Sequence, residues 1–238
     1  LRFLSRVAVA ASLHLPLVPL VARAQVPRQT GRIGAYTPPR MWPVRARVFD
    51  LLHQRIAISY DLDKRSVAGE VQTRLIVTAQ PTDTIRLDAS QLTIDGATDA
   101  KNATLKFTSD TGGVTVRLAK RAHVGDTVVF TLRYHGRPER GMYFVPRRRV
   151  MWTQGEAIET PSWVPTYNAP NDKTTWEILV TADTGVSVLS NGRLVGVTDA
   201  DGGAKKVWHW SQERPASTYL YSVVAGHFSI LHDSWRGV

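Results

Sequence analysis

Hydrophobic and polar residues alternate along most of this chain, with the two-residue period that places successive side chains on opposite faces of a strand. The alternation is clearest over residues 56–62 and 67–77. Residues 63–66 between them read Asp-Lys-Arg-Ser, which is typical of a hairpin turn. No segment after residue 24 shows the period of an amphipathic helix, so the pattern predicts an all-β fold that opens with a β-hairpin.

The same alternation returns along the rest of the chain, with turn-forming clusters between the runs. Residues 110–113 and 199–203 are rich in Asp and Gly and predict two further hairpin turns. The additional predicted strands lie within residues 114–118, 128–134, 176–180, 207–210 and 219–224. Many short strands at this spacing predict an antiparallel β domain, built as a sandwich or a curved pair of sheets.

The first 24 residues have the character of an export signal. Two arginines precede an apolar stretch over residues 7–21, and small residues occupy positions 22 and 24. The stretch is interrupted by two prolines and, at about 15 residues, is shorter than a bilayer-spanning helix. We expect residues 1–24 to be a signal peptide cleaved after Ala24, which leaves no membrane span and places the protein in the periplasm or outside the cell.

Composition narrows the remaining possibilities. Residues 25–48 are rich in Pro and Arg and predict an extended arm, followed by a β domain over residues 49–238. The chain has no cysteine, which excludes disulfides, thiol nucleophiles and cysteine-ligated metals within it. Loss of residues 1–24 removes three arginines and no acid, so the net charge falls from +10 to +7. An exported protein rarely meets nucleic acid, and we interpret the run of arginines at 147–149 as a solvated loop.

No familiar catalytic motif is present in these 238 residues. His-Glu-x-x-His, Gly-x-Ser-x-Gly and phosphate-binding loops are all missing. The seven histidines lack the three- or four-residue spacing of a helical metal site. The closest pair is His227 and His232 beside Asp233, and we interpret these as solvent-facing or structurally satisfied side chains, because nothing else supports a metal site there.

One stretch, residues 151–178, carries a specific set of motifs. It contains Gln154-Gly155-Glu156, then a Trp-x-Pro-x-x-Asn-x-Pro segment over residues 163–170, then a strand start at Lys173. The accompanying landmarks are Gly-Met-Tyr-Phe at 141–144, Ser-Asn-Gly at 190–192, Ser-Thr-Tyr-Leu at 217–220 and Val-Ala-Gly-His-Phe at 224–228. In this order, the landmarks resemble the N-terminal β domain of the aminopeptidase N family of zinc metallopeptidases. The resemblance covers residues 49–238, with one departure at Asn168, where the family usually has Asp.

The resemblance implies a saddle-shaped β domain that packs over a thermolysin-like catalytic domain of the same chain. It implies that Glu156 anchors the free α-amine of a peptide substrate and that Gln154 lines the pocket for the first side chain. It also implies that zinc belongs to the parent enzyme and that this chain holds no cofactor or catalytic residue of its own. We therefore expect the chain alone to be non-catalytic, with the zinc motif encoded after residue 238.

Two other interpretations of the sequence stay open. A stand-alone β domain could bind peptide N-termini or a partner protein, with Glu156 either as the anchor or as a solvent-facing strand residue. A sugar-binding sandwich is a further alternative, because Trp208 and Trp210 alternate and so share one face of a strand. Tryptophan in a β domain more often packs in the core or at a domain interface.

Overall fold

The computed structural model describes residues 45–229 and residue 231. Within them, fourteen strands form three sheets, and the only helical elements are short 3-10 turns. The strands are β1 (Phe49–Asp61), β2 (Ser66–Val77), β3 (Thr82–Asp88), β4 (Leu92–Asp99), β5 (Phe107–Asp110), β6 (Gly113–Ala122), β7 (Thr127–Gly136), β8 (Met142–Val145), β9 (Val150–Thr153), β10 (Lys173–Asp183), β11 (Ser187–Ser190), β12 (Arg193–Ala200), β13 (Lys205–Ser217) and β14 (Val223–Gly226). The turns are η1 (Pro146–Arg148), η2 (Thr160–Ser162), η3 (Asp201–Gly203) and η4 (Thr218–Leu220). The all-β prediction is confirmed.

The largest sheet has seven strands in the order β12-β13-β10-β1-β2-β7-β4. All its pairs are antiparallel except β1 with β10, which run parallel with Ile56 opposite Ile178. The alternating pattern does not reveal this parallel pair, because strand direction across a long sequence separation depends on how the intervening chain is routed. The antiparallel prediction therefore holds for every neighbouring pair except this central one.

The predicted hairpins are confirmed. β1 and β2 pair up to Asp61 opposite Ser66, β5 and β6 pair up to Asp110 opposite Gly113, and η3 joins β12 to β13. The prediction of a continuous strand over residues 219–224 is wrong at its start. Residues 218–220 form the turn η4, and only from Val223 does the chain join a sheet, because Thr218 and Tyr221 direct their hydroxyls into the interior.

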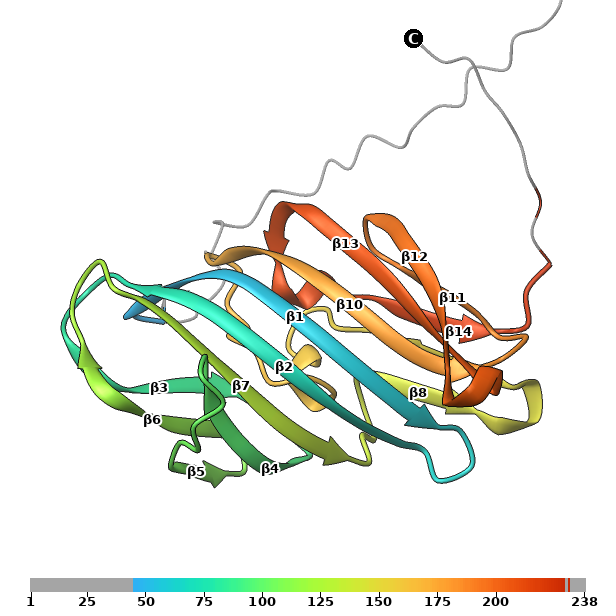
Figure 1. Cartoon of the computed structure of the whole chain (residues 1–238), viewed down its shortest axis with the longest axis horizontal. Coiled ribbons are helices and arrows are strands. Elements are labelled where there is room, and N and C mark those ends of the chain that lie inside the picture. Colours follow the sequence, from blue (N-terminus) through green and yellow to red (C-terminus); the bar gives the residue numbers. More distant parts are fainter. Residues whose placement is uncertain (1–44, 230, 232–238) are drawn as a thin grey trace, which may run out of the picture. The chain divides into compact units, whose positions relative to one another are not determined.

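Two smaller sheets lie at opposite ends of the large one (Figure 1). The three-stranded sheet β3-β6-β5 lies beside β7 and β4, and the four-stranded sheet β11-β14-β9-β8 lies beside β10 and β13. The hydrophobic core includes the inward residues of β1, β2, β7 and β10. Trp176 of β10 is one of them, and its ring centroid lies 4.5 Å from that of Tyr221. Residues 154–172 connect β9 to β10, and Thr166 within this segment pairs with Asp88 at the end of β3.

Several predictions fall on residues outside the described part. The signal peptide over residues 1–24, most of the arm over residues 25–48, and His232 with Asp233 all lie there. In the described residues, no helix has the length and apolar character required to cross a membrane.

Candidate functional site

The two residues assigned to substrate contact lie just beyond the end of a strand. β9 ends at Thr153, Gln154 follows it, and Glu156 begins a turn. Both side chains are exposed, and neither forms a hydrogen bond or ion pair with any other described residue. The alternative of a strand position for Glu156 does not hold, because the backbone NH of Glu159 bonds the carbonyl of Gly155 at 2.9 Å and turns the chain.

Gly155, between these two residues, lies against the neighbouring backbone. A Cβ at this position would collide with the Thr160 hydroxyl and with the carbonyl oxygen of Tyr219. Thr160 in turn donates a hydrogen bond to the carbonyl of Thr218 at 3.3 Å. The loop that presents Glu156 is therefore packed directly on η4, at a distance that only glycine permits.

Glu159 fixes the other end of the turn. Its carboxylate accepts hydrogen bonds from the backbone NH of Gly141 and from the hydroxyl of Tyr143, both at 3.1 Å. Gly141 has a positive φ of 77°, and a Cβ there would collide with the carbonyl of Glu159. Of the two glutamates in this turn, Glu159 is thus the one with a structural role, which leaves the Glu156 carboxylate exposed to solvent.

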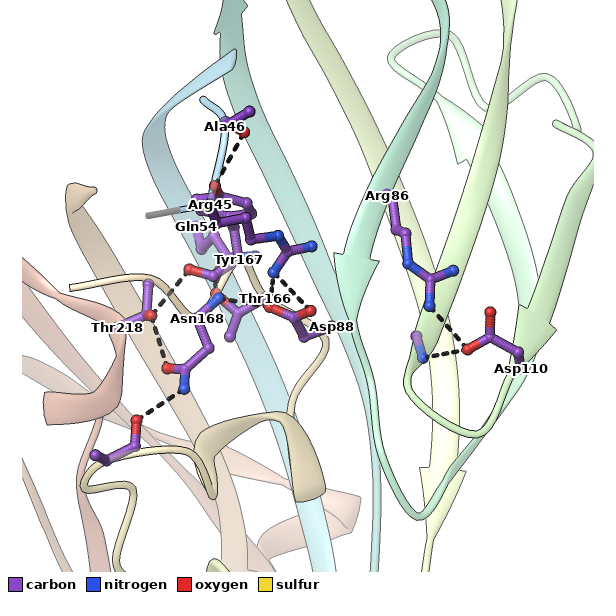
Figure 2. A network of polar contacts seen from close by, with 12 residues as sticks. Arg45, Ala46, Gln54, Arg86, Asp88, Asp110, Thr166, Tyr167, Asn168 and Thr218 are labelled. Carbon is purple, nitrogen blue, oxygen red and sulfur yellow. Dashed lines mark hydrogen bonds and ion pairs between the residues drawn. The ribbon is translucent and has the colours of Figure 1, made fainter. Parts of the chain in front are cut away.

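Asn168 ties the turn to two other segments. Its side-chain NH₂ donates to the carbonyl of Ala157 at 3.0 Å, and its side-chain oxygen accepts from the hydroxyl of Thr218 at 3.1 Å (Figure 2). A carboxylate could make only the second of these bonds, because it has no proton to donate. The departure from the usual Asp thus adds a bond directly to the residue that follows Glu156.

Asp88, at the end of β3, anchors the loop around Asn168. Its carboxylate accepts from the backbone NH of Asn168 at 2.9 Å and from the guanidinium of Arg45 at 2.6 Å (Figure 2). Its backbone exchanges two hydrogen bonds with Thr166, of 2.7 and 3.0 Å. Arg45 also lies 4.4 Å above the ring of Tyr167, in cation–π geometry.

Gln54 is the buried centre of this network. Its side-chain NH₂ donates to Thr73 at 2.9 Å and to the carbonyl of Pro165 at 3.2 Å. Its side-chain oxygen accepts from Thr166 at 2.6 Å and from Tyr221 at 2.9 Å. All four hydrogen-bonding positions of the Gln54 amide are therefore occupied by protein groups. These bonds join β1 to the segment between β9 and β10 and to the segment that precedes β14.

Asp172 is a buried acid at the C-terminal end of the loop. Loss of hydration, with a smaller contribution from the nearby Asp50, raises the pKa of its carboxyl to about 6, against the lowering effects of the Leu51 NH and of Arg47. The Leu51 NH lies 3.3 Å from the carboxylate, and the Arg47 guanidinium lies 3.4 Å from it. The charge is thus only partly compensated, which makes Asp172 sensitive to pH near neutrality.

The described residues offer no place for a metal. They contain no group of three or more His, Cys, Asp or Glu side chains arranged to hold an ion. The carboxylates of Glu159 and Asp88 already accept hydrogen bonds from backbone NH groups, and that of Asp88 also accepts one from Arg45.

Trp208 and Trp210 do point to the same face, as the alternation predicts. They lie opposite Val180 and Ile178 of β10 and so share the inward face of the large sheet. Both are half-buried, and both indole nitrogens are shielded from solvent. This placement is packing against the core and not an exposed aromatic platform for a sugar.

Comparison of the sequence with known proteins identifies related chains. The family model described as the peptidase M1 N-terminal domain matches residues 51–220. Aminopeptidase N of Caulobacter vibrioides is 26% identical over 189 residues, which cover 79% of this chain and 20% of that protein. Human aminopeptidase RNPEPL1 is 32% identical over 76 residues, which cover 32% of this chain and 10% of that protein.

Solved structures share the fold. The M1 zinc metallopeptidase from Deinococcus radiodurans superposes with a TM-score of 0.70 at 20% identity, over 76% of this chain and 43% of that one. Native yeast LTA4 hydrolase superposes with a TM-score of 0.65 at 18% identity, over 76% of this chain and 29% of that one. The present chain therefore spans less than half the length of each of these proteins.

The three-sheet fold places this chain with the all-β domains found in M1 zinc metallopeptidases of known structure. The chain belongs to the peptidase M1 N-terminal domain family, as the match over residues 51–220 shows.

Sequence motifs alone located Gln154, Glu156 and Asn168. The supporting residues Gln54, Asp88, Glu159 and Asp172 were missed, although Gln54 gave one signal, since it is a polar residue at an inward position of its strand.

Proposed function

We propose that this chain is the N-terminal, substrate-anchoring domain of a longer, exported zinc metallo-aminopeptidase. One observation carries the proposal: Glu156 has a free, exposed carboxylate on a loop whose neighbours are all fixed. Gly155, Asn168 and Glu159 hold the backbone on either side of it. A carboxylate positioned in this way can pair with the α-ammonium of a peptide in a charge-assisted hydrogen bond.

The geometry suits selection of a free N-terminus. An ammonium group offers a positive charge and several N–H donors, whereas an N-acetylated peptide offers neither the charge nor more than one donor. Gln154 lies two residues earlier on the same loop, where its amide would border the pocket for the first side chain. Hydrolysis itself, and the zinc it requires, would belong to a thermolysin-like catalytic domain of the same polypeptide, and residues 1–24 would direct export.

The proposal is tested in the longer polypeptide by Glu156→Gln. We expect kcat/KM on aminoacyl-anilide substrates to fall by about tenfold to a thousandfold, because the α-ammonium loses a charged partner. Bound zinc, measured by elemental analysis, should not change. The matched control is Glu70→Gln, which alters another exposed glutamate, on β2.

Wild-type kinetics in Glu156→Gln would refute the anchoring role. If the longer polypeptide has no aminopeptidase activity, the proposal that it is an aminopeptidase is refuted. If no such polypeptide is encoded, calorimetry of the present chain with free and N-acetylated peptides decides between a stand-alone binder of N-termini and a domain with no affinity for them.

A further inference from the structure

The short segment before β1 lies on the loop that carries the candidate site, and we call its residues 45–48 the clasp. Its backbone is held at the end of β2. The carbonyl of Val48 accepts the backbone NH of Thr78 at 3.0 Å, and the carbonyl of Arg47 accepts the Thr78 hydroxyl at 3.3 Å. The Arg47 guanidinium also lies 3.4 Å from the buried carboxylate of Asp172. The clasp is therefore fixed both to the large sheet and to the end of the loop.

Tyr167, in the middle of the loop between β9 and β10, is held between the clasp and β1. The Arg45 guanidinium lies 4.4 Å from the centroid of its ring, and the ring of Phe49 meets it edge-on with centroids 5.0 Å apart. Its hydroxyl donates to the carbonyl of Ala46 at 3.5 Å. A cation over the face of the ring and an aromatic edge beside it each favour one position, so these contacts fix Tyr167 in place.

A continuous series of polar contacts runs from Arg45 to the residue that follows Glu156 (Figure 2). One guanidinium nitrogen of Arg45 donates to both carboxylate oxygens of Asp88, at 2.8 and 2.6 Å. The same carboxylate accepts the backbone NH of Asn168 at 2.9 Å, and the Asn168 side chain donates to the carbonyl of Ala157 at 3.0 Å. Arg45 is therefore linked through Asp88 and Asn168 to the backbone beside Glu156.

Asp88 depends on Arg45 for its compensating charge. Among residues 45–229 and 231, only the Arg45 guanidinium forms an ion pair with its carboxylate, which is 22% exposed. Loss of that cation leaves a partly buried anion that gains hydration by turning toward solvent, and this movement weakens its bond to the Asn168 NH. The backbone of Asp88 stays in place, because it exchanges two hydrogen bonds with Thr166. The effect of Arg45 is thus directed along the loop toward Asn168.

We propose that Arg45 is a positioning residue for the Glu156 carboxylate, and that the clasp belongs to the substrate-anchoring site without contacting substrate itself. The inference rests on the proposed function. Glu156 forms no hydrogen bond or ion pair with any other described residue, so the backbone of its turn alone sets where the carboxylate lies. Arg45 controls that backbone through Asp88 and Asn168, from a position more than 100 residues earlier in the chain.

The first test uses the present 238-residue chain and requires no activity. Arg45→Gln removes the cation, whereas Arg45→Lys keeps a cation whose single nitrogen can still bridge both oxygens of the carboxylate. The matched control is Arg117→Gln, which removes the arginine that pairs with Asp83 at 3.1 Å near the start of β3. Hydrogen exchange of the Asn168 and Glu159 amides is measured by NMR, because the first donates to the carboxylate and the second closes the turn.

We expect Arg45→Gln to raise the exchange rate of both amides by about tenfold or more, while amides of the large sheet keep their rates. Arg45→Lys should retain most of the protection, and Arg117→Gln should retain all of it. Unchanged exchange in Arg45→Gln would overturn the proposal. A uniform rise over the loop and the large sheet would also overturn it, since that result would show a general loss of stability.

The second test, in the longer polypeptide, asks whether Arg45 acts through Glu156. We expect Arg45→Gln to lower kcat/KM on aminoacyl-anilide substrates by about threefold to thirtyfold, and to change it by less than about twofold in the Glu156→Gln background. A full effect of Arg45→Gln in that background would overturn the positioning role. Faster exchange of the Asn168 amide together with wild-type kinetics of Glu156→Gln would support control of the turn by the clasp while refuting the anchoring role.

Discussion

The side-chain amide of Asn168 donates a hydrogen bond to the carbonyl of Ala157 at 3.0 Å, one residue after Glu156. The two residues come from different parts of the loop between β9 and β10, and the bond fixes the backbone on which the proposed anchor sits. Because an amide proton makes this bond, a substitution that removes the proton shows how far Asn168 controls the position of Glu156.

Asn168→Asp should weaken this part of the loop. A carboxylate cannot donate to Ala157, and it introduces a negative charge beside Asp88, whose carboxylate accepts the NH of residue 168. We expect the free energy of unfolding to fall by about 1 kcal/mol, as measured by urea denaturation, and KM of the longer polypeptide to rise. The matched control is Gln72→Glu, the same chemical change on the outer face of β2. Equal stability of both variants would contradict the role assigned to the amide.

Gly155→Ala should displace the turn. The added Cβ meets the carbonyl oxygen of Tyr219, which is backbone and cannot rotate away, as well as the Thr160 hydroxyl. We expect a loss of about 1–3 kcal/mol in the free energy of unfolding. Gly196→Ala on β12 is the matched control, because a Cβ there meets nothing within 4 Å. If the two variants melt at the same temperature, the close packing of the loop on η4 is not as described.

Gln54→Leu should be among the most destabilising single substitutions in the chain. Leucine fills a similar volume but leaves Thr73, Thr166, Tyr221 and the carbonyl of Pro165 without their buried partner. We expect a loss of about 2–4 kcal/mol, measured by chemical denaturation. Gln72→Leu, at an exposed position of the neighbouring strand, should change stability by less than about 0.5 kcal/mol. A neutral effect of Gln54→Leu would show that the network does not contribute to stability.

Asp172 should make the domain less stable as pH rises toward neutrality. Its folded pKa of about 6 lies above the ordinary 3.8, so the folded state binds the proton more tightly than the unfolded state. Stability from this group is complete below about pH 4 and is lost as pH rises to about 6. Asp172→Asn should therefore stabilise the domain at pH 7 by roughly 1–3 kcal/mol relative to its effect at pH 4, as followed by thermal denaturation.

Asp110 provides a control of opposite sign. Its hydrogen bond from Arg86 lowers the pKa of its carboxyl to about 2 (Figure 2). Its contribution is therefore present above about pH 4 and is lost as pH falls toward 2. Asp110→Asn should destabilise the domain at pH 7 and have little effect at pH 2. The same pH dependence in both variants would show that burial of Asp172 is not the cause.

Only part of the candidate site could be predicted from the sequence, because its residues are held by partners that are distant along the chain. Gln154, Glu156 and Asn168 lie in local motifs, and motifs are visible in a linear sequence. The partners that hold them are not local: Asp88 is 80 residues from Asn168, and Gln54 is 167 residues from Tyr221. Nothing in a side-chain pattern encodes which distant polar groups meet, because that depends on strand order and on the routing of the chain between strands.

By itself, the sequence determined the all-β class, the hairpin turns and the family, because the two-residue period and short motifs depend on neighbours along the chain. Tertiary structure alone decided that β1 and β10 run parallel, that Gln154 and Glu156 lie beyond a strand, and that Glu159 is the glutamate of this turn with a structural role. It also decided that Tyr143, Trp152, Val224 and Leu189 lie side by side on neighbouring strands of the four-stranded sheet. Alternation states only that two sets of side chains face opposite ways, whereas burial of one set or both depends on which layers pack against the sheet.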